Sequence, residues 1–230
     1  MPYRSKRYRK DAERATEQAL PLADAIKRLK TFSKTRFDQS VDLVCHLGID
    51  ANQADQAVRG SFSFPRGIGK SKKVIAFCPD GDVAAAKAAG AVEAGNDDLV
   101  DKVNKGWTDF DVAISHPSLM GKVGRLGKVL GPQGKMPSPK AGTVTADVAT
   151  AVKEFAAGRI EFRNDKGGNI HVPVGRFSFS DDDLQTNIAA FIEQIRRVKP
   201  AAAKGAYLRK VVISGTMTPG VQIDVAAHAE

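Results

Sequence analysis

Several residue types that build catalytic or cross-linked sites are scarce in this chain of 230 residues. It contains only two cysteines, Cys45 and Cys78, which are far apart, so neither a zinc knuckle nor a disulfide framework is expected and a reducing compartment is favoured. The four histidines lack metal-ligand spacing. No apolar run reaches membrane-spanning length, and the basic N-terminus lacks the apolar core of a secretory signal. We therefore expect a cytoplasmic protein with no metal, no cofactor and no membrane partner.

Phosphate-binding motifs are also missing. A dinucleotide motif G-x-G-x-x-G is absent, and a P-loop needs a glycine five residues before its Gly-Lys pair. At that position the pairs beginning at Gly69, Gly127 and Gly134 have Phe64, Lys122 and Val129. A nucleotide-dependent enzyme is the alternative to a binding protein, but it lacks a phosphate motif, a metal cluster and a paired acid and base.

Acidic residues are absent between Asp111 and Asp147, where glycine, proline and basic residues accumulate. Glycine and proline disfavour a regular helix or a central strand, so the segment 121–144 is expected to be irregular. Exposed backbone N–H groups beside uncompensated cations suit a polyanion, and a solvated loop is the alternative. The basic side chains concerned are Lys122, Arg125, Lys128, Lys135 and Lys140.

The charge of the whole chain favours an anionic partner. Its net charge is +9 and its pI is about 9.6. Residues 1–36 carry eleven Lys/Arg against four Asp/Glu, whereas residues 80–111 carry eight acids against three lysines. This uneven distribution predicts that one face turns towards the polyanion and another away from it. A generic nucleic-acid binder is a further alternative, but it leaves the acidic stretch unexplained.

Hydrophobic periodicity divides the chain into three stretches. The first has a flexible basic arm at residues 2–10, a helix from Pro21, and strands at 41–49 and 57–64. The second alternates buried strands at 74–78 and 111–115 with helices at 82–89, 97–104 and 145–157. The third has a β-hairpin of strands 159–163 and 169–174, a helix capped by Ser180, and strands at 207–214 and 221–225.

This order of elements predicts an α/β protein with two domains. The first and third stretches share an antiparallel style, so residues 1–66 and 159–230 are expected to form one split α/β domain. Residues 67–158 are expected to form an inserted doubly wound α/β domain. Gly67, Gly69 and Gly158 mark the crossings, where glycine can absorb the backbone changes of a hinge.

Long stretches also resemble one protein family. The segment GRLGKVLGPQGKMPSPKAGTV is similar to the signature of the bacterial large-subunit ribosomal proteins of the L-one family. Further stretches agree with that family in order: KRY, RFDQSVD, LGID, DQAVRG, GWTDFDV, AGRIEFRNDKGGNIHVPVG, KGAYLR and GTMTPGV. The resemblance covers nearly the whole chain. It implies a split α/β domain carrying an inserted Rossmann-like three-layer domain, which coincides with the division above.

The resemblance also implies a function. Proteins of this family bind large-subunit ribosomal RNA at the mobile stalk beside the exit site, where they assist release of deacylated tRNA. They can also bind their own messenger RNA and repress its translation. The expected partners are therefore large-subunit ribosomal RNA, exit-site tRNA and the protein's own messenger RNA, with the free protein a monomer.

The RNA contacts that the resemblance implies lie mainly on the split domain. An exposed Phe37 beside Arg36 would stack on a base, whereas a buried Phe37 would be a core residue. Asp165 has the wrong sign for a phosphate, so it is expected to accept from a 2′-hydroxyl or to orient a cation. Thr218 stands where the family commonly has glycine. The implied contacts are Arg36, Phe37, Ser40, Arg163, Asp165, Lys166, His171, Thr216, Met217 and Thr218, with the five basic residues of 121–144 as a secondary RNA contact.

Overall fold

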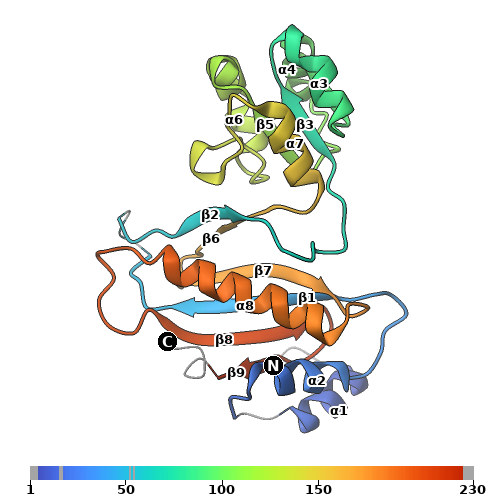
Figure 1. Ribbon diagram of the computed structural model, residues 1–230, viewed down its shortest axis with the longest axis vertical. Coiled ribbons are helices and arrows are strands. Elements are labelled where there is room, and N and C mark those ends of the chain that lie inside the picture. The colour runs from blue at the N-terminus through green and yellow to red at the C-terminus, as the bar shows by residue number, and fades with distance from the viewer. Residues whose placement is uncertain (1–4, 16–17, 52, 54, 225–230) are drawn as a thin grey trace. The chain divides into compact units, whose positions relative to one another are not determined.

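The computed structural model describes residues 5–15, 18–51, 53 and 55–224, which fold into two compact units (Figure 1). The first unit comprises the described residues of Met1–Gly69 and Phe162–Glu230, and the second is Lys70–Glu161. Helices pack on β-sheets in both units. The expected α/β fold class is therefore confirmed.

The first unit is built on a four-stranded antiparallel sheet with the order β7-β1-β8-β9. The strands are β1 (Ser40–Leu47), β7 (Asn169–Arg176), β8 (Leu208–Gly215) and β9 (Val221–Ile223). Along β1 buried apolar residues alternate with half-buried ones, because successive side chains of a strand point to opposite faces. β1, from the N-terminal part of the chain, thus pairs directly with two strands from the C-terminal part.

Two helices, α2 (Leu22–Lys30) and α8 (Asp181–Arg197), cover one face of this sheet (Figure 1). The Ser180 hydroxyl accepts from the N–H of Asp183 and so caps α8, and the aspartates of the first turn favour its positive end. Leu184, Ile188, Phe191, Ile192 and Ile195 recur at helical spacing and are buried. The opposite face of the sheet carries the half-buried side chains of β1.

The expected β-hairpin around Lys166–Gly168 is wrong. β6 (Ile160–Arg163) pairs with β2 (Arg59–Phe62) in a separate two-stranded sheet, whereas β7 pairs with β1. The two flanks are joined by an isolated bridge, Asn164 to Ile170, and by a bond from the Asp165 N–H to the Asn169 carbonyl at 2.8 Å. The turn therefore connects two sheets, and long-range pairing has replaced the local ladder.

The expected flexible arm is wrong for its described part, because Lys6–Arg14 form helix α1. The Ser5 hydroxyl accepts from the N–H of Tyr8 and caps this helix. Asp11 is fully buried, and its Oδ1 accepts from the N–H of Ser33 at 3.2 Å and from its hydroxyl at 2.8 Å. These bonds fasten α1 to the segment that leads into β1. The start of the expected arm, including Tyr3, lies outside the described residues.

The second unit is a three-layer α/β fold around a parallel sheet with the order β4-β3-β5. Its strands are β3 (Val74–Phe77), β4 (Glu93–Gly95) and β5 (Val112–Ser115). Helices α3 (Val83–Ala88) and α7 (Val148–Ala156) pack on one face, and α4 (Asp97–Asn104) packs on the other. Both faces are covered, as the unbroken burial of β3 requires.

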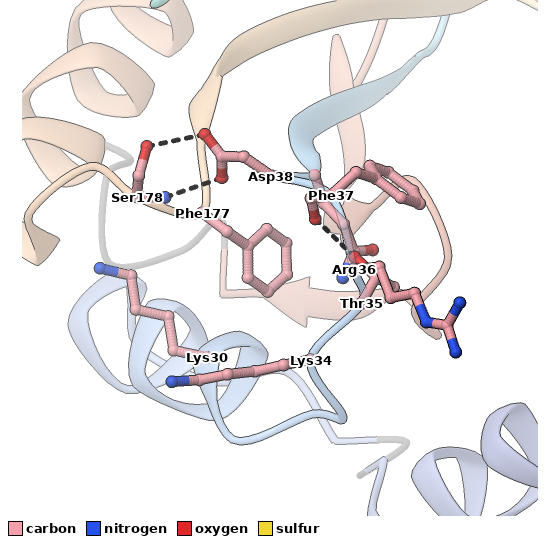
Figure 2. Close-up of a pocket in the computed structure, with 9 residues that line it drawn as sticks. Lys30, Lys34, Thr35, Arg36, Phe37, Asp38, Phe177 and Ser178 are labelled. Carbon is pink, nitrogen blue, oxygen red and sulfur yellow. Dashed lines mark hydrogen bonds between the residues drawn. The ribbon is translucent and has the colours of Figure 1, made fainter.

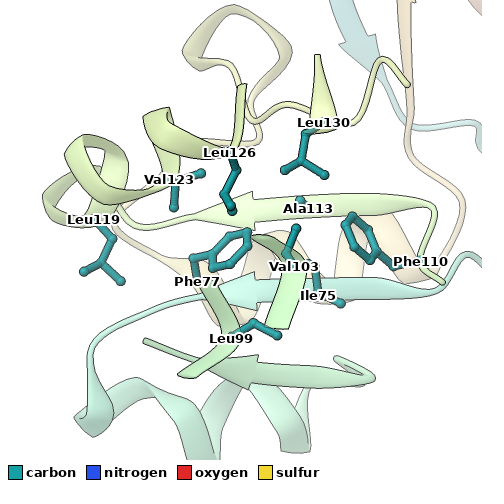
Figure 3. Close-up of a cluster of buried hydrophobic side chains, with 10 residues drawn as sticks. All are labelled: Ile75, Phe77, Leu99, Val103, Phe110, Ala113, Leu119, Val123, Leu126 and Leu130. Carbon is teal, nitrogen blue, oxygen red and sulfur yellow. The ribbon is translucent and has the colours of Figure 1, made fainter. Parts of the chain in front are cut away.

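The expectation that residues 121–144 lack helix is wrong for their first half. This half forms short turns of helix: α5 (Met120–Val123), η3 (Gly124–Leu126) and α6 (Gly127–Leu130). Val123, Leu126 and Leu130 are fully buried and pack with Ile75 and Phe77 (Figure 3). Their burial outweighs the low helix propensity of the glycines between them. The segment is therefore part of the core, with its basic side chains on the outside.

Candidate nucleic-acid interface

The contact residues expected on the first unit lie in two groups along β1. The Met217 cluster, at the start of β1 and the end of β8, comprises Arg36, Phe37, Ser40, Thr216, Met217 and Thr218. The Asp165 cluster, near the end of β1, comprises Arg163, Asp165, Lys166 and His171. A strand rises about 3.3 Å per residue, so the ends of Ser40–Leu47 are roughly 23 Å apart. His171 lies between them, opposite Val44. The arrangement is an elongated surface rather than a pocket.

Hydrogen bonds fix the backbone of the Met217 cluster. Thr216 N–H donates to the carbonyl of Ser40 at 3.2 Å, and the Ser40 N–H donates to the Thr216 hydroxyl at 3.2 Å. The N–H of Met217 donates to Oε1 of the buried Gln39 at 2.9 Å. These bonds hold the turn after β8 against the start of β1, and so present its side chains in a fixed orientation.

Two large apolar side chains of this cluster face solvent. Phe37 is 51% exposed and Met217 is 48% exposed, so Phe37 is not a core residue. Arg36 is exposed beside Phe37 and makes no ion pair or hydrogen bond with any residue that the structure describes. An exposed aromatic ring, a flexible thioether and a free guanidinium suit stacking on a base together with contact to a phosphate.

Thr218 differs from the rest of the cluster because it is only 8% exposed. Its hydroxyl accepts from the N–H of Gly215 at 2.8 Å and donates to the carbonyl of Pro219 at 3.2 Å. The hydroxyl is thus used inside the turn. We expect Thr218 to act by holding the turn that presents Met217.

Helix α1 adds residues that sequence reasoning missed. Arg7 Nη2 donates to the carbonyl of Met217 at 3.4 Å. A hollow of about 280 Å³ lies between Ser5, Arg7 and Tyr8 on one side and residues 216–218 on the other. The cap at Ser5 is the signal in the sequence that places these cations on a helix.

The Asp165 cluster is a hydrogen-bonded turn. Asp165 accepts from the N–H groups of Gly167 at 2.8 Å and Asn169 at 2.7 Å, and its Oδ2 lies 3.5 Å from Nε2 of His171. The bond from the Asn169 N–H is the main cause of a pKa for Asp165 below its usual value. The carboxylate therefore shapes the turn, while Arg163, Lys166 and His171 remain exposed.

The open face of the sheet joins the two clusters. Asp42, Val44 and His46 of β1 are half-buried there. Nδ1 of His46 lies 2.9 Å from Oδ1 of Asn169, which connects this face to the Asp165 turn. Burial raises the pKa of Asp42, and the neighbouring His171 opposes that shift. The face is mostly polar and carries few charges. Such a surface suits contact with sugars and base edges as well as phosphates.

The basic residues of 121–144 differ in how free they are. Nζ of Lys122 pairs with Asp97 at 2.7 Å, so the expectation that nothing neutralises these charges is wrong for Lys122. Nζ of Lys135 donates to the Thr108 carbonyl at 2.9 Å and lies 5.1 Å from the centre of the Phe110 ring. Arg125 and Lys128 are exposed, with no hydrogen bond or ion pair to any described residue. The side chain of Lys140 lies outside what the structure describes.

Both cysteines lie in environments that disfavour a reactive thiolate. Burial raises the pKa of the Cys45 thiol to about 12 and also raises that of Cys78, so both thiols stay protonated at neutral pH. The described residues contain no group of three His, Cys, Asp or Glu side chains placed to hold a metal ion. Among the described helices none has the length and apolar character needed to cross a membrane.

Comparison with known proteins gives a consistent result. Residues 29–219 match the model of the ribosomal protein L1p/L10e family. The large ribosomal subunit protein uL1 of Kosmotoga olearia is 51% identical over 227 residues, covering 97% of each chain. The protein of the same name from Nocardioides sp. is 50% identical over 223 residues, covering 96% of this chain and 92% of its own. That of Chlorobaculum tepidum is 46% identical over 224 residues, covering 97% of each.

Proposed function

The chain belongs to the ribosomal protein L1p/L10e family, and from this membership we propose that it is a structural protein of the large ribosomal subunit that binds large-subunit ribosomal RNA. It is not an enzyme, and it acts in translation as a ribosomal component in the cytoplasm. Within the subunit its binding site is the mobile stalk beside the exit site for deacylated tRNA.

The observation that carries this proposal is the Met217 cluster. There the exposed side chain of Met217, held on a hydrogen-bonded turn, and the exposed ring of Phe37 accompany a free guanidinium. Burying Phe37 and Met217 against bases removes apolar surface from water, while Arg36 offers a planar donor to phosphate. The Asp165 cluster, roughly 23 Å along the same strand, supplies a second contact to an elongated ligand.

Two further activities follow from this position on the ribosome. The protein assists release of deacylated tRNA by moving with the stalk that it binds. It also represses translation of its own messenger, by binding there an RNA fold that presents the same contacts. Free protein is monomeric, which leaves both clusters available to either RNA.

Co-sedimentation with ribosomal subunits tests the central proposal. We expect the full chain to travel with the large subunit through a sucrose gradient at moderate salt, and Met217→Ala to shift part of it to the free fractions. Sedimentation with the small subunit alone, or at the top of the gradient in every condition, would contradict the proposal. Repression of its own messenger is checked separately, by in vitro translation of that messenger with added protein.

Binding to the stalk RNA should weaken as salt is raised. Binding releases counterions from the RNA, and the free energy gained from this release falls as the salt concentration rises. If the cations of the two clusters and α1 neutralise about five phosphates, log K should therefore fall with log[salt] with a slope of about −3.5 to −4.5. Filter binding across a series of KCl concentrations gives the slope. A slope near zero would remove phosphate contacts from the explanation.

Replacing Phe37 by alanine should reduce affinity without unfolding the protein. Loss of one stacked base costs about 1–3 kcal/mol of binding free energy. The ring is half in solvent, so thermal stability should stay close to that of the wild type. Affinity for stalk RNA and the melting temperature are measured on the same preparation. A large drop in melting temperature with unchanged affinity would refute the stacking role.

A further inference from the structure

A second hollow is lined partly by Arg36 and Phe37 of the Met217 cluster and partly by residues that have no role in the contacts described so far. It has a volume of about 540 Å³, within the range of about 300–1,000 Å³ usual for small-molecule sites. Its walls come from the end of α2, from the segment before β1, and from the segment between β7 and α8. Figure 2 shows the ring of Phe177 in the middle of the lining residues, with Lys30 and Lys34 on one side and Asp38 on the other.

The walls of this hollow are held in place by bonds between distant parts of the chain. Asp38 accepts from the N–H of Ser178 at 3.2 Å and from its hydroxyl at 2.8 Å (Figure 2). The carbonyl of Asp38 also accepts from Nη1 of Arg176 at 3.1 Å. The hollow is therefore formed before any ligand arrives, which lowers the cost of ordering it on binding.

Phe177 is fixed through both its backbone and its ring. Its backbone N–H donates to the carbonyl of Gln39 at 2.9 Å, and the side chain of Gln39 accepts from the N–H of Met217. A methyl group at position 215 would lie 2.4 Å from Cε2 of Phe177, so only glycine there lets the ring tip rest on β8. Phe177 is only partly buried, and its side chain lines the hollow with an aromatic surface.

The two lysines that line the hollow differ in whether their charge is paired. Nζ of Lys30 is neutralised by Asp181 at 2.5 Å, whereas Lys34 is exposed and pairs with no residue in the described part of the chain. The carboxylate of Asp38 accepts from Ser178 and keeps its negative charge, but it forms no ion pair with Lys34. One free ammonium and one aromatic face lining the same hollow match the phosphate and base of a single nucleotide.

We propose that this hollow receives one unstacked nucleotide of the bound RNA, with its base against Phe177 and its phosphate paired with Lys34. The inference rests on the proposed function, because the RNA chain reaches the hollow from Phe37, which lines its rim. Sequence-specific recognition of RNA commonly uses bases that are splayed out of loops and bulges. The hollow would thus read a looped nucleotide next to the region contacted by Met217.

The test measures binding of a transcript of the stalk region to full-length variants. Phe177→Ala should weaken binding by about 5- to 150-fold, which corresponds to the loss of one stacked base. Phe177→Tyr should bind as the wild type does. Phe177→Leu keeps an apolar side chain on Gly215 but has no flat face, so it should lose most of the affinity that Phe177→Ala loses. Wild-type affinity for Phe177→Leu would overturn the proposal.

Lys34 is tested through salt dependence. Lys34→Ala should reduce the magnitude of the log K against log[salt] slope by about 0.7–0.9, and Lys34→Arg should restore it. Val92→Ala, a change at a 52% exposed residue of the second unit, is the matched control and should change neither affinity nor slope. An unchanged slope for Lys34→Ala would remove the phosphate contact from the proposal.

Two further arms separate this inference from other outcomes. Weak or absent competition by AMP supports a nucleotide held within RNA, whereas tighter binding of AMP than of the transcript would assign the hollow to free nucleotides and overturn the proposal. If Phe37→Ala weakens binding while all Phe177 variants bind normally, the proposed function stands and the nucleotide site falls. If the wild type itself shows no specific binding, both fall.

Discussion

A chain in which Gly69 is joined to Ile160 by a short Gly/Ser linker should fold and still bind stalk RNA specifically, although more weakly than the full chain. Both contact clusters of β1 belong to the unit that this chain retains. Nζ of Lys72 donates to the carbonyl of Arg159 at 3.2 Å. The segments that leave and re-enter the first unit are therefore no farther apart at this point than the length of one lysine side chain. A short linker can therefore close the gap, and closure entropy grows only slowly with length.

The isolated fragment Lys70–Glu161 should instead bind RNA only non-specifically, with a Kd of roughly 10⁻⁴–10⁻⁶ M. It keeps Arg125 and Lys128 as exposed cations but none of the ten residues expected to contact RNA on the first unit. Titration of both fragments with stalk RNA at one salt concentration makes the comparison, and circular dichroism confirms that each is folded. Specific binding by Lys70–Glu161 alone would overturn this division of roles.

Replacing Asn187 by alanine should destabilise the protein by about 3–5 kcal/mol, the largest single-residue effect that we expect. Asn187 is fully buried on α8, and its side chain makes three bonds to backbone groups. Oδ1 accepts from the N–H of Arg66 at 3.1 Å, and Nδ2 donates to the carbonyls of Gly67 and Val174, each at 2.9 Å. Alanine would leave the buried carbonyl of Val174 without this donor and would remove both part-buried bonds to the Arg66–Gly67 backbone.

Thermal and urea unfolding of Asn187→Ala measure this effect. At about 2–4 °C per kcal/mol for a protein of this size, the melting temperature should fall by roughly 6–20 °C. Gln185→Ala, on the exposed side of the same helix, is the matched control and should leave the melting temperature nearly unchanged. Equal effects of the two changes would mean that the bonds of Asn187 contribute little to the free energy of unfolding.

The same bonds limit where the chain can bend. Gly67 is held by Asn187, and a side chain at Gly69 would lie 2.8 Å from the ring of Phe179. Both glycines have positive φ values, 64° and 69°, which other residues rarely adopt. They serve tight local geometry against the first unit. Flexibility at the outgoing crossing is therefore expected after Gly69 rather than at it.

The elements that the sequence predicts well are those with long apolar periodicity. α8 shows its buried stripe directly, and β3 shows an unbroken apolar run. α1 was missed because its one buried residue is Asp11, which leaves no apolar stripe, and β4 because it consists of three half-buried residues. In 121–144 the many glycines hid the helical spacing of Val123, Leu126 and Leu130, whose burial decides the local structure.

The candidate site could be predicted only in part. The resemblance supplied Phe37 and Met217, but no pattern in the sequence fixes whether an aromatic residue before a strand is buried or exposed. Asp38, Gln39 and Phe177 enter the site through bonds between segments about 140 residues apart. Such pairings depend on the folded sheet, so local periodicity does not contain them. The RNA contacts of all these residues stay predictions.

The pairing of β1 also fixes when the site can exist during synthesis. Ser40 and Thr216, which bond at the start of β1, are 176 residues apart. At roughly 5–20 residues per second, about 9–35 s separate their appearance on the growing chain. The strands of the second unit pair with near neighbours and can assemble in that interval. An unfinished copy therefore has no Met217 cluster, and only a nearly complete chain can compete for the RNA that the finished protein binds.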